Sequence, residues 1–109
     1  MTALAGLFLI AHGLVHLAIW LPEPKADAPF DPLHSWLFRD GDRPVRALAV
    51  SACVMLVAAG VLVLTGAGLG AGLAVAGAAL SLVLVVATFH PWLLGAVAIN
   101  TAIVAVGLT

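Results

Sequence analysis

The sequence predicts an all-α membrane protein: a single domain over residues 1–109, built as a bundle of four transmembrane helices, with one short interfacial helix in the first loop. Two observations lead to this class. Hydrophobic residues make up 64% of the chain and charged residues only 8%, whereas a soluble domain carries roughly 25% charged residues. The charges are also segregated, because all five acidic and all four basic residues fall within residues 23–46. The apolar segments on either side of that stretch can therefore lie inside a bilayer.

The first apolar run covers residues 2–21, about the 20 residues that a helix needs to cross the hydrocarbon core. A cleavable signal peptide is the alternative, because Ala26, Asp27 and Ala28 have the form of a cleavage site. However, no basic residue precedes the run, the run is longer than a usual signal core, and Pro29 would directly follow the cut. We therefore expect an uncleaved helix.

Residues 22–43 form the first loop, and the prolines near its start oppose a helix there. Asp31 followed by Pro32 is typical of a helix start, with an N-cap and a proline in the first helical position. Leu33 and Trp36 then recur at helical spacing. This pattern predicts a short helix within residues 31–38, lying in the membrane interface with its apolar face toward the lipid.

Three more apolar runs predict helices over residues 44–64, 71–89 and 92–108. Pro44 suits the first position of the second helix, and Pro91 separates the last two runs. The alternative is three spans, with those two runs joined in one bent helix. A joined run is too long for a single crossing, so four spans are favoured.

Small residues recur every fourth position at the start of the third helix, in two rows: Gly66, Gly70, Ala74 and Ala78, and Gly68, Gly72 and Ala76. Such spacing lets helix backbones approach closely inside a membrane. It could serve the packing of the bundle itself, or a contact with a partner protein or a second copy of the chain.

The four Lys and Arg residues all lie in or directly after the first loop. The positive-inside rule therefore places residues 22–43 in the cytoplasm. With four spans, both termini then lie outside the plasma (inner) membrane, and His90 shares the cytoplasmic side with the charged loop. The expected partners of the chain are the lipid bilayer and other membrane helices.

Two histidines and one asparagine fall inside the predicted spans. His12 and His16 are one turn apart, so they share a face of the first helix with Trp20, which we expect at the interface. Asn100 follows Trp92 by about two turns, and His12 precedes Trp20 by the same interval, so both lie about 12 Å deep. Because polar groups facing hydrocarbon are costly, we expect both histidines to face the bundle interior near Asn100.

These residues allow two interpretations. In the first, they hydrogen-bond across helices and fix the helix register. In the second, they bind a group, for which the donor types leave haem b, a quinone head group or a divalent metal open. The cofactor-binding candidates are His12, His16, His90 and Asn100, and the metal-ligand candidates are His12, His16, His34 and His90.

The spacing of the histidines narrows the second interpretation. His12 and His16 are suitably spaced to share a metal ion, but no glutamate follows His12 as a zinc protease requires. A haem with two histidine ligands would take one from each of two helices, for example His16 and His90. No carboxylate lies at membrane depth to orient such ligands.

The sequence gives less support to other classes of function. The net charge of -1 offers no basic surface for nucleic acid. Cys53 is the only cysteine, so an internal disulfide is excluded. The predicted spans contain no acidic or basic residue near their middle, which coupled transporters and retinal proteins usually need. A small transporter or a histidine-dependent proton path is therefore a second alternative.

Several short motifs are similar to those of one group of proteins: His12-Gly13-Leu14-Val15-His16, then Ser35-Trp36-Leu37, then Phe89-His90-Pro91-Trp92. The chain resembles small four-helix integral membrane proteins of high-GC bacteria. This resemblance implies four spans over nearly the whole chain, and it implies no particular activity. As function, the sequence favours a non-catalytic membrane component, an accessory or anchor subunit of a larger assembly, over an enzyme. The alternative is a redox protein that uses the histidines.

Overall fold

The computed structural model describes residues 2–23, 27–28, 30–38 and 42–108. Helices make up the regular structure of this part of the chain, which contains no strand. In chain order the elements are α1 (Thr2–Trp20), α2 (Arg43–Leu64), α3 (Gly70–Ala87), the 3₁₀ turn η1 (Pro91–Leu93) and α4 (Leu94–Gly107). The all-α prediction is confirmed, and each helix lies within a few residues of its expected range.

Three of these helices are long and apolar enough to cross a membrane. They are α1, α2 and α3, with 19, 22 and 18 residues. The fourth apolar segment, Pro91–Gly107, is shorter. Pro91 separates this segment from the preceding run, and the first turn of the segment is 3₁₀. At 1.5 Å per residue, its 17 residues reach about 25 Å, slightly less than a typical hydrocarbon core.

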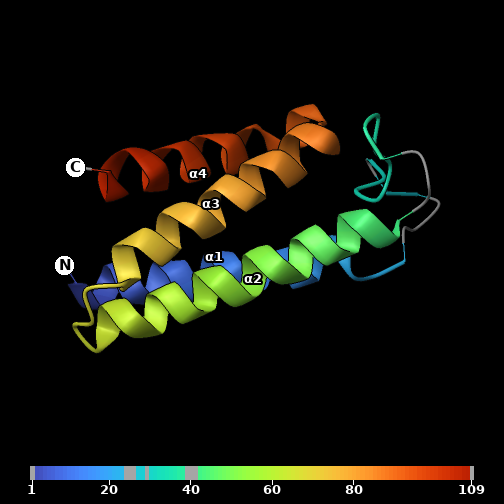
Figure 1. The fold of residues 1–109 in the computed structure, drawn as a ribbon. Helices are drawn as coiled ribbons and strands as arrows, with labels where there is room; N and C mark the ends of the chain where they lie inside the picture. The colour runs from blue at the N-terminus through green and yellow to red at the C-terminus, as the bar shows by residue number, and fades with distance from the viewer. Residues whose placement is uncertain (1, 24–26, 29, 39–41, 109) are drawn as a thin grey trace.

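The helices run up and down in chain order, each packed on the one before it (Figure 1). Both termini and the turn between α2 and α3 lie at one end of the bundle. The first loop and the junction between α3 and α4 lie at the other end. His90, in that junction, therefore shares its end with the charged residues of the loop, as the sequence predicts. The contact of α4 with α1 is slight compared with its contact with α3.

Glycines allow α1 and α2 to pack closely. A Cβ atom on Gly60 would lie 2.6 Å from the backbone oxygen of Gly6 and 2.6 Å from Cγ1 of Ile10. A Cβ atom on Gly13 would lie 3.1 Å from the backbone oxygen of Cys53. Neither backbone oxygen can move aside without moving its helix, so these glycines set the distance between α1 and α2.

The two small-residue rows of α3 have different surroundings. Gly70, Ala74 and Ala78 are buried, and a Cβ atom on Gly70 would lie 2.9 Å from Cγ2 of Val63 in α2. A Cβ atom on Gly68 or Gly72 would meet nothing within 4 Å. Within this structure, close packing of α3 thus uses Gly70, Ala74 and Ala78 of the first row, and Gly68 and Gly72 of the second row have no close neighbour.

The short helix expected within residues 31–38 does not form. Side chains compete with the helical hydrogen bonds there: Asp31 Oδ1 accepts from the backbone N–H of Leu33 (2.9 Å), and Ser35 Oγ accepts from that of Phe38 (3.0 Å). The segment is also attached to α3. Ser35 Oγ–H donates to the carbonyl of Ala87 (2.7 Å) and Trp36 Nε1–H to that of Val86 (2.6 Å). These carbonyls end a helix and have no helical partner, so the loop satisfies α3 instead of forming its own helix.

Arg46 ties the end of α1 to the start of α2. Its Nε–H donates to the carbonyl of Trp20 (3.3 Å), one of the last carbonyls of α1. Its guanidinium also pairs with Asp42 (2.6 Å) and with Glu23 (3.1 Å). The Asp42 side chain therefore pairs with Arg46 and does not cap α2, although Asp42 is the N-cap residue.

Candidate functional site

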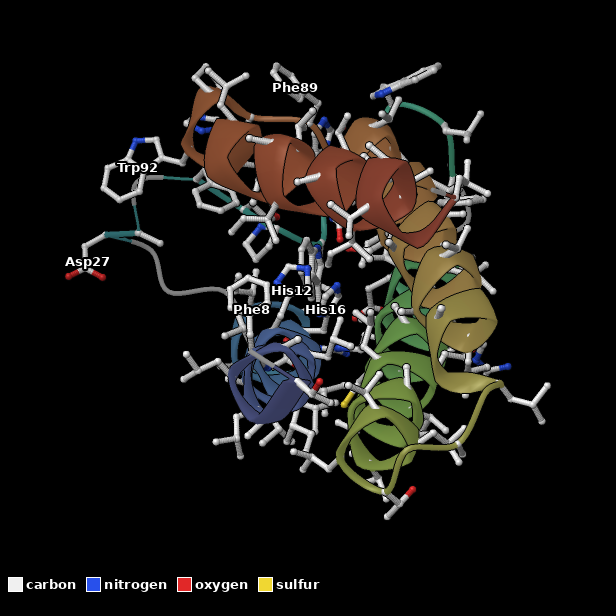
Figure 2. All side chains as sticks on the ribbon, turned by 90° about the vertical axis from the view of Figure 1, so that its left-hand side faces the viewer. Phe8, His12, His16, Asp27, Phe89 and Trp92 are labelled. Carbon is white, nitrogen blue, oxygen red and sulfur yellow. The ribbon has the colours of Figure 1, made fainter. Side chains whose placement is uncertain are left out.

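Four rings line the inner face of α1. Phe8, His12, His16 and Trp20 follow one another at intervals of four residues, which places them above one another on a helix. Their ring centroids are 5.9, 5.2 and 5.4 Å apart along this series. Figure 2 shows Phe8, His12 and His16 reaching from α1 into the space between α1 and α4. The prediction that both histidines face the interior is confirmed.

Side chains of α1, α3 and α4 form a chain of hydrogen bonds in that interior. His12 Nε2–H donates to Asn100 Oδ1 (2.8 Å), and Asn100 Nδ2–H donates to Ser81 Oγ (2.7 Å). Ser81 Oγ–H donates to His16 Nε2 (2.6 Å), and His16 Nδ1–H donates to the backbone carbonyl of His12 (2.9 Å). This series of hydrogen bonds therefore begins and ends on His12. We call these four residues the polar ring.

The direction of each hydrogen bond follows from the groups that can only donate or can only accept. The carbonyl of His12 only accepts, so His16 carries its proton on Nδ1 and accepts on Nε2. The amide nitrogen of Asn100 only donates and its oxygen only accepts, so His12 carries its proton on Nε2. Both imidazoles are neutral in this arrangement, which suits a site without a counter-ion. Nδ1 of His12 then keeps a lone pair that has no partner among the described residues.

Ser81, which was not among the residues expected at the site, completes the polar ring. It is fully buried and accounts for two of the four hydrogen bonds. A signal was present, because Ser81 is the one polar side chain in the otherwise apolar α3. Polar residues inside a membrane helix usually face other helices, which would have drawn attention to it.

Ligation of a metal or haem iron by His16 would have to break the polar ring. Both ring nitrogens of His16 are engaged, one with Ser81 and one with a carbonyl. His12 offers only Nδ1. Within the described residues, no three His, Cys, Asp or Glu side chains are grouped closely enough to hold a metal ion. The geometry therefore uses these histidines for packing, with one open acceptor.

The other two histidines belong to a different group at the loop end of the bundle. His34 and His90 line a hollow of about 420 Å³ together with Phe30 and Asp31. Phe30 stacks on the imidazole of His90, with centroids 4.8 Å apart. The backbone N–H of Trp92 donates to His90 Nδ1 (3.2 Å), so a neutral His90 carries its proton on Nε2 and has no second lone pair for a metal.

Trp20, which we expect near the membrane interface, is buried within the protein at the end of α1. Only 1% of its surface is exposed, and it belongs to one buried cluster with Leu33 of the first loop, Val45 near the start of α2 and Leu93 at the end of η1. Its indole N–H is the one fully buried side-chain donor without a partner in the described part of the chain. The exposed tryptophans are Trp36 and Trp92, both at the loop end.

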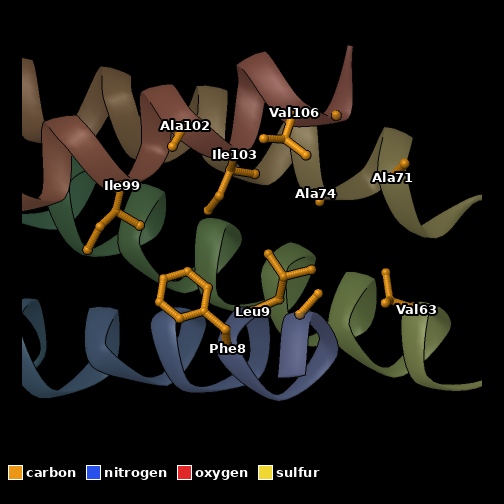
Figure 3. A pocket seen from close by; sticks show the side chains of 11 residues that line it. Phe8, Leu9, Val63, Ala71, Ala74, Ile99, Ala102, Ile103 and Val106 are labelled. Carbon is orange, nitrogen blue, oxygen red and sulfur yellow. The ribbon is translucent and has the colours of Figure 1, made fainter. Parts of the chain in front are cut away.

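An apolar cavity of about 510 Å³ separates α1 from α4 (Figure 3). Phe8 and Leu9 line it from α1, and Ile99, Ile103 and Val106 line it from α4. Small side chains on the surrounding helices leave this space open: Ala5, Ala71, Ala74, Ala102 and Gly107. None of the residues that line the cavity has a polar side chain.

The structure thus brings His12, His16 and Asn100 together, and it places His34 and His90 in a second group. The first group lies between the helices, and the second lies at the end of the bundle that carries the first loop (Figure 1). Comparisons of the chain with known protein families, with curated proteins and with solved structures find no match.

Proposed function

We propose that this chain is a non-catalytic integral membrane protein that acts as an accessory or anchor subunit of a larger membrane assembly. The observation that carries the proposal is the polar ring. Every buried polar side chain within the described helices is used to join α1, α3 and α4. Such use fixes helix register and leaves no nitrogen of His16 for chemistry.

The chemistry available at the polar ring also supports this function. General acid–base catalysis needs a titratable group within reach of a substrate, and His16 is engaged on both nitrogens with 2% of its surface exposed. A metal or redox centre needs several ligands, and His12 contributes a single free lone pair. The cofactor-binding alternative, with haem b or a divalent metal, is therefore the second choice.

The surface of the bundle offers positions where a partner helix could pack. Among the residues of α4, only Asn100 is buried, so most of the surface of this helix that does not pack on α3 is available to lipid or protein. Gly72 on α3 and Gly95 on α4 have no atoms within 4 Å of an added Cβ. Exposed glycines in membrane helices permit close approach of another helix. The partner is another membrane protein or a second copy of the chain.

The proposal includes an orientation in the plasma membrane. The bundle crosses four times, with the charged first loop in the cytoplasm and both termini outside. The support is the positive-inside rule, since all four Lys and Arg residues fall within residues 25–46 of the sequence, in or directly after the first loop. The short fourth segment can still cross if the bilayer thins slightly around it.

Disulfide or maleimide crosslinking in native membranes tests the accessory role. In a Cys53→Ala background, a cysteine at exposed Gly72 should give a specific crosslinked product of higher mass, whereas a cysteine at buried Ala78 should not. A monomer from both variants would contradict an accessory role.

An absorption spectrum and a metal analysis of the purified protein separate the two candidate functions. The accessory role predicts no haem absorption and no stoichiometric metal. A haem band or a bound metal that is lost in His16→Ala would instead establish the cofactor-binding function.

A further inference from the structure

The hollow at the loop end of the bundle differs in its chemistry from the cavity between α1 and α4. Its volume is about 420 Å³, and six residues line it: Phe30, Asp31, His34, Thr88, Phe89 and His90. Four of these side chains are polar, whereas the cavity between α1 and α4 is lined by apolar side chains alone. We call this space the loop-end hollow. Its lining suits a ligand that carries a polar group.

Asp31 gives the loop-end hollow a carboxylate that has no cation beside it. Its Oδ1 accepts a hydrogen bond from the backbone N–H of Leu33 (2.9 Å), which holds the side chain in a local turn. Glu23 and Asp42 both pair with Arg46, but no described Lys or Arg side chain pairs with Asp31. The lining of the hollow contains no Lys or Arg. The second carboxylate oxygen can therefore pair with a cation from outside the chain.

The other polar groups of the lining are mostly acceptors. Thr88 Oγ1–H donates to a carbonyl of α3 (2.9 Å), so only the lone pairs of this hydroxyl remain available. A neutral His34 offers one ring nitrogen as an acceptor. Phe30 and Phe89 add aromatic rings, which attract cations. An ammonium group has three N–H donors and no acceptor, so it matches this lining, whereas an anion would face the carboxylate with no balancing charge.

The loop-end hollow lies beside the exposed tryptophans of the bundle. Phe30, in its lining, contacts the ring of Trp92 with centroids 6.4 Å apart, and Trp92 is 69% exposed. Trp36 is also exposed, and its indole N–H holds the loop segment to the end of α3. Exposed tryptophans of membrane proteins lie at the level of the lipid head groups. The hollow is therefore within reach of the ammonium groups that lipids carry.

We propose that the loop-end hollow binds a primary ammonium group, held by a hydrogen-bonded ion pair with the carboxylate of Asp31. The group is carried by the ethanolamine head group of a phospholipid or by a free amine of the same chemistry. The methylene groups next to the ammonium pack against Phe30 and Phe89. This site goes beyond the accessory role and does not depend on it.

Two pairs of ligands test the site in the unmodified protein and separate the two sources of the ammonium group. The lipid pair is phosphatidylethanolamine and phosphatidylcholine with the same acyl chains, and the free pair is ethanolamine and choline. Within each pair the charge is the same, but the second member has no N–H donor. Affinities come from the rise of the thermal unfolding midpoint in detergent as each ligand is added.

The primary ammonium compound should bind roughly threefold to tenfold more tightly than its partner, the ratio that one hydrogen bond of ordinary strength gives. A preference in the lipid pair alone would identify the head group as the ligand. A preference in the free pair, with or without one in the lipid pair, would show that the ammonium group suffices without acyl chains. No preference in either pair would overturn the proposal.

Two matched aspartates of the first loop test the carboxylate. Asp31 lines the loop-end hollow, whereas Asp27 is exposed and lines neither the hollow nor the cavity between α1 and α4. Asp31→Asn keeps an oxygen that accepts from the N–H of Leu33 and removes the charge, so the preference should be lost while the turn persists. Asp27→Asn changes the net charge equally and should keep the preference. A preference that survives Asp31→Asn, or that both variants lose equally, would overturn the site.

Discussion

At the scale of single residues, each hydrogen bond of the polar ring depends on a specific donor and a specific acceptor. Ser81 is its most constrained member, since its hydroxyl accepts from Asn100 and donates to His16. Removing that hydroxyl leaves a buried amide N–H and a buried imidazole nitrogen without partners. Buried groups left in this way cost more than the hydrogen bond itself contributes, because they have lost water as well.

Ser81→Ala should therefore lower the free energy of unfolding by about 1–2 kcal/mol. The measurement is a denaturing-detergent titration followed by circular dichroism. Ser51→Ala is the matched control, because Ser51 lies within α2 with its side chain exposed, and it should change little. Equal midpoints for the two variants would show that the ring contributes nothing to stability.

The residues of the candidate site differ in how far the sequence could predict them. His12 and Asn100 could be paired, because helical rise gives depth and a polar group in lipid needs a partner at the same depth. Ser81 could not be assigned in this way, since a serine in a helix can satisfy itself on its own backbone. The burial of Trp20 within the protein could not be predicted, because a tryptophan at the end of a span suits the interface and the bundle core equally well.

At the scale of elements, the helix limits follow from the apolar runs, but helix contacts do not. A pattern of small residues indicates that another helix can pack closely, but it does not indicate which helix packs there. Gly70 and Ala74 face α2, whereas Gly68 and Gly72 face outward. Contacts with a distant segment also decide the structure of the first loop. Asp31 and Pro32 predict a helix start, but Ser35 and Trp36 donate hydrogen bonds to carbonyls at the end of α3 instead.

A matched pair of glycine substitutions separates the two kinds of glycine. Gly60→Ala should lower the free energy of unfolding by about 1–3 kcal/mol, because the new Cβ would meet the backbone oxygen of Gly6. Gly72→Ala should be neutral or slightly stabilising, since its Cβ meets nothing and alanine favours helix. Unfolding titrations of the two variants under the same conditions provide the comparison. The reverse order of stability would contradict the α1–α2 contact described here.

At the scale of the whole molecule, one end of the bundle is polar and the other is apolar. The first loop, Arg46 and the junction before α4 gather at one end, and the turn between α2 and α3 lies at the other with both termini. Exposed Trp36 and Trp92 lie at the polar end, where amphipathic rings suit the boundary between lipid and water. This asymmetry supports the orientation proposed for the protein in a membrane.

Cysteine accessibility can determine both the direction and the number of crossings. In a Cys53→Ala background, a membrane-impermeant maleimide applied to spheroplasts should label a cysteine at Gly68 and not one at Asp27, because the positive-inside rule holds the charged loop in the cytoplasm. A cysteine at Leu108 tests the short fourth segment. Figure 1 places the end of α4 at the same end of the bundle as the α2–α3 turn, so this cysteine should label together with the one at Gly68. Labelling of Asp27 from outside would reverse the orientation. A Leu108 cysteine that reacts only in inside-out vesicles would show that the fourth segment does not cross.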